Sequence, residues 1–94
     1  MTAKELRAKW VEALRSGRYK QAHGQLRDVD TFCCLGVLCD VVDPTRWEGD
    51  GFAYGDDVCQ KVGITARQQE HLISMNDGDK LSFAEIADHI EALP

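Results

Sequence analysis

Residues 31–42, TFCCLGVLCDVV, constrain the fold of this chain most strongly, because they are apolar on nearly every side. A segment without a polar face has to be buried all round. Periodicity alone does not separate a strand from a helix in so short a run. Asp30 or Thr31 as an N-cap, and Asp43-Pro44 as a stop, favour a central helix over residues 31–42. Gly36 in its middle lets another backbone approach closely.

Three capping boxes predict where further helices begin: Thr2 with Glu5, Thr65 with Gln68, and Ser82 with Glu85. The first box opens an amphipathic helix that places Leu6, Trp10 and Leu14 on one stripe and ends at Ser16-Gly17. The other two open a C-terminal pair of helices. Residues 76–79, NDGD, lie between that pair and predict a polar turn.

The remaining segments predict only short elements of secondary structure. Residues 18–30 have no helical period and predict a short β-hairpin, and residues 56–62 predict a short helix that ends at Gly63. Residues 44–57 predict a loop or short ribbon fixed to the core by its aromatic residues, namely Trp47, Phe52 and Tyr54. The expected fold is one α+β, mainly helical domain over residues 1–94. In it the N-terminal helix and a C-terminal helical hairpin pack around the central helix 31–42.

The N-terminus and the cysteines bear on location. Charged residues interrupt the first ten residues, which excludes a secretory signal, and no apolar run reaches the roughly 20 residues that cross a bilayer. We therefore expect a cytoplasmic protein with no membrane contact, in which thiols stay reduced. The spacing of the four cysteines does not match a zinc site, so we expect buried thiols and no metal.

The charge distribution argues against duplex DNA as a partner. The net charge is −5, whereas binding to duplex DNA depends on neutralising phosphates. The C-terminal pair of helices looks like the first two helices of a helix-turn-helix, but the third helix, which enters the major groove, does not follow. Residues 1–28 are locally basic, with seven Lys and Arg against three acids.

No motif points to catalysis. The chain lacks GxSxG, HExxH and GxxxxGK, and three of the cysteines lie in the most apolar segment, which raises a thiol pKa instead of lowering it. We expect a protein that is not an enzyme, with no catalytic residues and no cofactor.

The segment RSGRYKQAHGQLR, residues 15–27, is the best candidate for binding a ligand. Its cations suit a phosphate, Tyr19 offers a ring, and its amide and imidazole side chains suit the edge of a base. Trp47 in the aromatic loop is a second candidate. The alternative is an edge strand whose Tyr19 and Leu26 pack inward. The predicted ligand-binding residues are Arg15, Arg18, Tyr19, Lys20, Gln21, His23, Gln25, Arg27 and Trp47.

The chain resembles a group of small phage and prophage accessory proteins with a Cys-Cys-Leu-Gly-Val-Leu-Cys core. The resemblance rests on five sequence segments, namely WVEALRSGRYKQ, LR, FCCLGVLCDV, MND and FAEIADHIE. The resemblance implies the cytoplasm of a bacterial host cell and gives no mechanism. By analogy with phage proteins that counter host defence, we expect a homo-oligomer that sequesters a small nucleotide signal. The alternative is a protein–protein inhibitor or structural accessory that uses an acidic C-terminal face on a host target.

Overall fold

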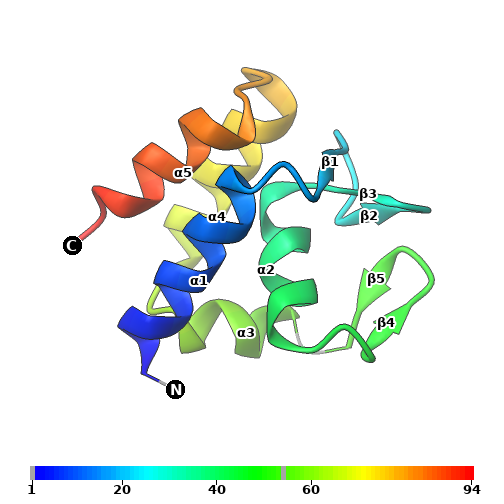
Figure 1. The fold of residues 1–94 in the computed structure, drawn as a ribbon, viewed down its shortest axis with the longest axis horizontal. Coiled ribbons are helices and arrows are strands. Elements are labelled where there is room, and N and C mark those ends of the chain that lie inside the picture. Colours follow the sequence, from blue (N-terminus) through cyan, green and yellow to red (C-terminus); the bar gives the residue numbers. More distant parts are fainter. Residues whose placement is uncertain (1, 54) are drawn as a thin grey trace.

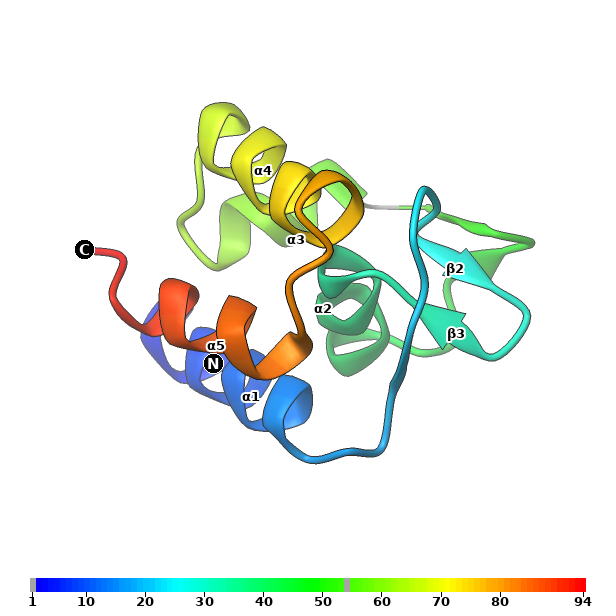
Figure 2. The same cartoon turned by 90° about the horizontal axis from the view of Figure 1, so that it is seen from above.

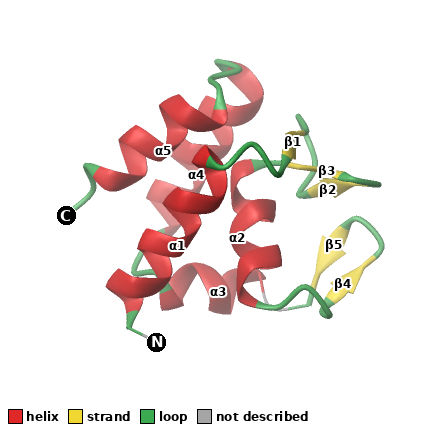
Figure 3. Ribbon diagram, viewed as in Figure 1, coloured by secondary structure: helices red, strands yellow, loops and turns green. Residues whose placement is uncertain are grey.

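The computed structural model describes residues 2–53 and 55–94 and shows a mainly helical α+β fold (Figure 1). Helices gather on one side and the short strands on the other (Figure 3). Tyr54, expected to fix the 44–57 loop, lies outside the described residues. In chain order the elements are α1 (Ala3–Arg15), β1 (Lys20–Gln21), β2 (Arg27–Asp28), β3 (Thr31–Phe32), α2 (Cys34–Val42), β4 (Trp47–Glu48), β5 (Gly51–Phe52), α3 (Gly55–Lys61), α4 (Ala66–Ile73), the π-helical turn η1 (Ser74–Gly78) and α5 (Phe83–Glu91).

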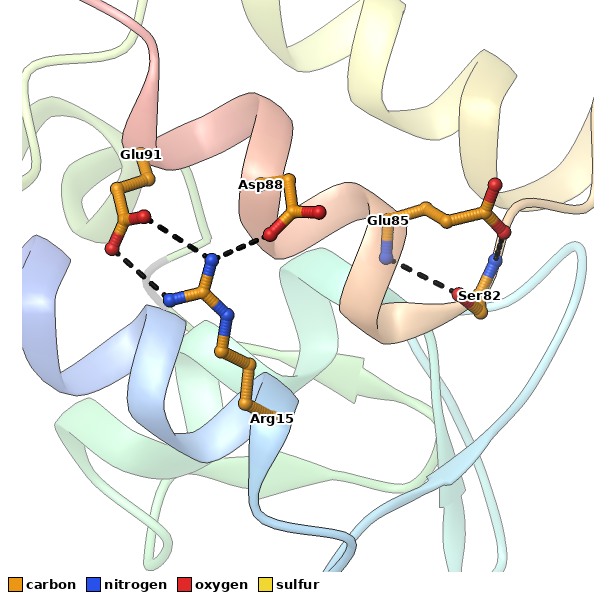
Figure 4. Close-up of polar contacts among 5 residues, drawn as sticks. All are labelled: Arg15, Ser82, Glu85, Asp88 and Glu91. Carbon is orange, nitrogen blue, oxygen red and sulfur yellow. Dashed lines mark hydrogen bonds and ion pairs between the residues drawn. The ribbon is translucent and has the colours of Figure 1, made fainter.

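All three predicted capping boxes are confirmed. At α1 the Thr2 hydroxyl accepts a hydrogen bond from the Glu5 amide, and the Glu5 carboxylate accepts one from the Thr2 amide, both at 3.1 Å. Thr65 and Gln68 make the same reciprocal pair at α4, and Ser82 and Glu85 make it at α5 (Figure 4). Each box satisfies amides that the first turn of a helix leaves unpaired.

The central helix α2 is buried along most of its length, as the apolar run predicted, and packs against α1 and α4 (Figure 1). Its predicted start at residue 31, with Asp30 or Thr31 as N-cap, is wrong. The N-cap is Cys33, whose sulfur accepts a hydrogen bond from the Gly36 amide at 3.4 Å. Thr31–Phe32 is a strand, because it pairs with neighbours on both sides.

Gly36 is the point where a second backbone touches α2, as predicted. A Cβ atom on Gly36 would overlap the Leu26 carbonyl oxygen and lie 2.9 Å from the Leu26 carbonyl carbon. The Leu26 carbonyl also accepts a hydrogen bond from the Cys33 amide at 3.1 Å. The absence of a side chain at residue 36 therefore fixes how closely the sheet lies against α2.

The strands of the first sheet occur in the order β1-β3-β2. β2 and β3 form an antiparallel hairpin over residues 27–32, and β1 joins the other edge of β3 in parallel. The short β-hairpin predicted over residues 18–30 is thus displaced toward the C-terminus, and residues 20–21 form a third strand. Because side chains alternate along a strand, Gln21, Phe32 and Arg27 face one side of this sheet and Lys20, Thr31 and Asp28 the other.

The two C-terminal helices cover different neighbours: α4 packs on α2, whereas α5 lies along α1 (Figure 2). The predicted polar turn at residues 76–79 is wrong. That segment is mostly the π-helical turn η1, and Asn76 is completely buried in it. Arg15 ties α1 to α5 by ion pairs to Asp88 at 2.6 Å and to both carboxylate oxygens of Glu91 at 3.0 and 3.2 Å (Figure 4).

We expect Arg15→Gln to lower the thermal stability slightly at low salt, and to lose that effect in 1 M NaCl, because surface ion pairs are weak and screened. Arg15 lowers the pKa of Glu91 in the folded protein. The stabilisation is therefore present above the carboxyl's ordinary pKa and is lost as the pH falls through its lowered value. Thermal melts of both proteins between pH 2 and 7 measure this, with Arg67→Gln on α4 as a matched control. A difference that persists in 1 M NaCl would contradict the prediction.

Candidate functional site

Asp40, in the last turn of α2, accepts hydrogen bonds from two aromatic residues. The Tyr19 hydroxyl donates to Oδ2 at 2.7 Å, and the Trp47 indole N–H donates to Oδ1 at 3.0 Å. Burial and the hydrogen bond to Asp40 raise the pKa of Tyr19 to about 12. One carboxylate thereby fixes the segment before β1 and the β4–β5 ribbon to the same end of α2.

Four half-buried rings follow one another across this region, and we call them the aromatic row: Tyr19, Phe32, Trp47 and Phe52. Ring centroids are 5.1 Å apart for Tyr19 and Phe32, 5.7 Å for Phe32 and Trp47, and 5.2 Å for Trp47 and Phe52. The first and last pairs meet edge to face, an arrangement that the charge distribution of aromatic rings favours. The row joins the three-stranded sheet to the β4–β5 ribbon.

Arg27 lies over the middle of the aromatic row. Its guanidinium carbon is 5.2 Å from the centroid of Trp47 and 5.9 Å from that of Phe32, within the range of cation–π attraction. Its Nε donates to the Val29 carbonyl at 3.0 Å. Its two Nη groups make no hydrogen bond to any residue in the described ranges 2–53 and 55–94. The planar guanidinium of Arg27 is thus held over the rings of Trp47 and Phe32, and its Nη groups are available to donate hydrogen bonds to a ligand.

Gln21 lies on the same side of the sheet as Arg27, but its side chain is bound in a polar network around Asn76. Its amide nitrogen donates to Asn76 Oδ1 and to the Leu81 carbonyl, both at 2.8 Å. Asn76 in turn donates to the Ala22 carbonyl at 2.8 Å and to Asp77, and accepts from the Cys34 amide at 3.3 Å. The amide of Gln21 therefore joins β1 to η1 and is not presented to a ligand.

The structure divides the predicted ligand-binding residues into groups. Tyr19, Arg27 and Trp47 come together at the aromatic row, whereas Arg15 is bound to α5. Lys20 faces the opposite side of the sheet from Arg27. Gln21 belongs to the Asn76 network, and the remaining three are exposed in the connections on either side of β1, namely Arg18, His23 and Gln25.

A family model described as Domain of unknown function (DUF8296) matches residues 2–54, more than half of the chain. The chain belongs to DUF8296. No curated protein and no solved structure matches the chain. The DUF8296 match includes Arg27, Asp40 and the whole aromatic row, whereas Asn76 and α5 lie outside it.

The sequence analysis missed two residues of the candidate site, Asp40 and Phe32. Asp40 carried a usable signal, since it is the only charged residue within the run 31–42. A charge in such a run is retained at low cost only when partners satisfy it. Phe32 gives no such signal, because an apolar residue within the run 31–42 fits the predicted buried helix equally well.

The thiols of the DUF8296 protein have the character of core side chains. All four are buried, and burial raises the pKa of Cys33 and Cys34 and raises that of Cys39 to about 12. A raised pKa lowers the thiolate fraction that nucleophilic attack requires. Within the part of the chain that the structure describes, no three His, Cys, Asp or Glu side chains are grouped so as to hold a metal ion. The described helices also include none long and apolar enough to span a bilayer.

The acidic C-terminal face of the DUF8296 protein is partly occupied by its own chain. Asp88 and Glu91 bind Arg15, and the Glu85 carboxylate caps α5 (Figure 4). These intramolecular partners lower the charge that this face presents to a basic target. Among the described residues, the Nη groups of Arg27 at the aromatic row have no such partners.

Proposed function

We propose that this DUF8296 protein is a non-enzymatic, phage-type accessory protein that sequesters a small nucleotide signal, and so counters host defence, at Arg27 and the aromatic row. The observation that carries the proposal is the placement of the Arg27 guanidinium over Trp47 and Phe32, with its Nη donors unused by the described residues. Guanidinium binds phosphate oxygens in pairs, and half-buried rings stack on bases.

The turn beside Arg27 supports the same surface. Val29, whose carbonyl holds Arg27, is 81% exposed and has a φ of 57°. A β-branched residue in this left-handed conformation is strained, and strain of this kind concentrates at functional sites. Arg18 adds positive charge near Tyr19, since its charge acts on the Tyr19 hydroxyl. In this proposal Tyr19 and Gln21 support the site from inside, and Arg27 with Trp47 contacts the ligand.

The test is native mass spectrometry followed by calorimetric titration with a panel of cyclic di- and trinucleotides. We expect one member to bind stoichiometrically, and Arg27→Gln to weaken it by roughly 10- to 100-fold, as expected for losing a charge-assisted hydrogen bond. Arg27→Lys keeps the charge but loses the planar fork, so it should bind more weakly than the wild type. Arg67→Gln on α4 makes the same charge change as Arg27→Gln and should bind normally. Absence of binding across the panel, or equal binding by Arg27→Gln, would contradict the proposal.

A further inference from the structure

The outer face of α1 carries three exposed residues in one row, at a spacing of four residues: Lys4, Ala8 and Glu12. Residues four apart lie one above another on a helix. α1 lies at the outside of the molecule in Figure 2, with α5 along one side. Among the described residues neither Lys4 nor Glu12 has an ion-pair partner. We call these three residues the α1 row.

The α1 row lines a groove of about 1050 Å³. Val62 and Leu93 lie on its walls, and Arg7 holds those walls together by donating to the carbonyls of Val62 and Leu93. The Arg7 Nε–Val62 distance is 3.3 Å and the Nη2–Val62 distance is 2.8 Å. The groove is therefore built on a fixed scaffold, with the small side chain of Ala8 between two opposite charges.

The α1 row is complementary to itself. A twofold rotation about an axis through Ala8 places Lys4 of one copy opposite Glu12 of the other, and the reverse pair forms by symmetry. The two charges lie eight residues apart, roughly 12 Å along the helix, so each is about 6 Å from the axis. Rows of residues four apart are also the ridges that interlock when two helices pack. The small Ala8 at the centre allows the backbones to come close.

We propose that two copies of this protein associate through an antiparallel contact of their α1 helices, centred on Ala8, with reciprocal Lys4–Glu12 ion pairs. This dimer is independent of the nucleotide site, which lies at the other side of α2. The contact rests on exposed charges and a short helix face, so the dimer dissociates on dilution and as the salt concentration rises.

Charge exchange tests the pairing. In sedimentation equilibrium at 50 mM NaCl we expect a reversible dimer for the wild type. Lys4→Glu and Glu12→Lys each place like charges opposite one another and should weaken dimerisation at least tenfold. The double variant K4E/E12K restores both pairs and should dimerise like the wild type. Lys9→Glu, exposed on α1 but outside the row, is the matched control and should also dimerise. Circular dichroism checks that each variant is folded.

A cysteine at the axis gives a second measurement. Two Ala8→Cys side chains would face each other within the Cα separation that a disulfide needs. Treatment with diamide should convert this variant to a covalent dimer, whereas Lys9→Cys and the wild type, with its buried thiols, should stay uncrosslinked. A monomeric wild type, a double variant that does not recover, or an uncrosslinked Ala8→Cys protein would each overturn the proposal.

Discussion

Replacing Gly36 with alanine is expected to lower the free energy of unfolding by roughly 3 kcal/mol, at the upper end for overpacking a core. The added methyl would overlap the Leu26 carbonyl oxygen, which is backbone and cannot move aside as a flexible side chain can. That carbonyl is also held by the Cys33 amide. The strand segment must then move off α2, although alanine is the better helix former. Urea denaturation followed by tryptophan fluorescence measures the loss.

Gly78→Ala is the matched control for Gly36→Ala. A Cβ atom at residue 78 meets only the Ser74 hydroxyl at 3.8 Å, an ordinary contact, and the backbone there does not require glycine. Such a change leaves stability within about 1 kcal/mol of the wild type. Equal midpoints for Gly36→Ala and the wild type would contradict the close approach of Leu26 to α2.

Asn76→Ala is expected to cost a similar amount, about 3 kcal/mol, because it leaves several buried groups without a partner at once. The Ala22 carbonyl loses its donor, and the Cys34 amide loses its acceptor. The amide of Gln21 keeps only the Leu81 carbonyl. Asn76 is completely buried, so water does not replace these bonds without entering the core. Urea midpoints of the variant and the wild type measure the cost.

A double-mutant cycle with Gln21→Ala separates this network from simple loss of volume. Because both residues serve the same buried bonds, the double variant should be less destabilised than the sum of the single changes by at least about 0.5 kcal/mol. Strict additivity would show that Asn76 acts without Gln21.

The sequence predicted best those features that depend on neighbours along the chain. The capping boxes at Thr2, Thr65 and Ser82 join residues three apart, so their residue types identify them. The burial of residues 34–39 followed from the lack of a polar face. The close approach of a second backbone at Gly36 could be predicted as well, because the lack of a side chain explains why a glycine occurs within such a helix.

The errors concern features set by distant contacts. Thr31–Phe32 forms a strand because β1 and β2 flank it, and neither pairing leaves a mark in residues 31–32 themselves. Asn76 is buried because its partners lie 42 to 55 residues earlier, so a polar NDGD sequence indicated a turn instead. In the candidate site, residue types suggested Arg27 and Trp47 as ligand-binding residues, and the structure places these two side chains in contact. The residue types did not indicate that the Tyr19 hydroxyl and the Gln21 amide form hydrogen bonds within the protein itself.

The packing of α1 against α5 joins the two ends of the chain and bears on the order of events during synthesis. Leu6, Trp10 and Leu14 are synthesised well before residues 83–91, which cover α1 together with α2. The apolar face of α1 therefore stays incompletely covered until residues 83–91 have been synthesised. Closing so long a loop also slows folding relative to a bundle with local contacts. The core is therefore complete only after α5 has left the ribosome.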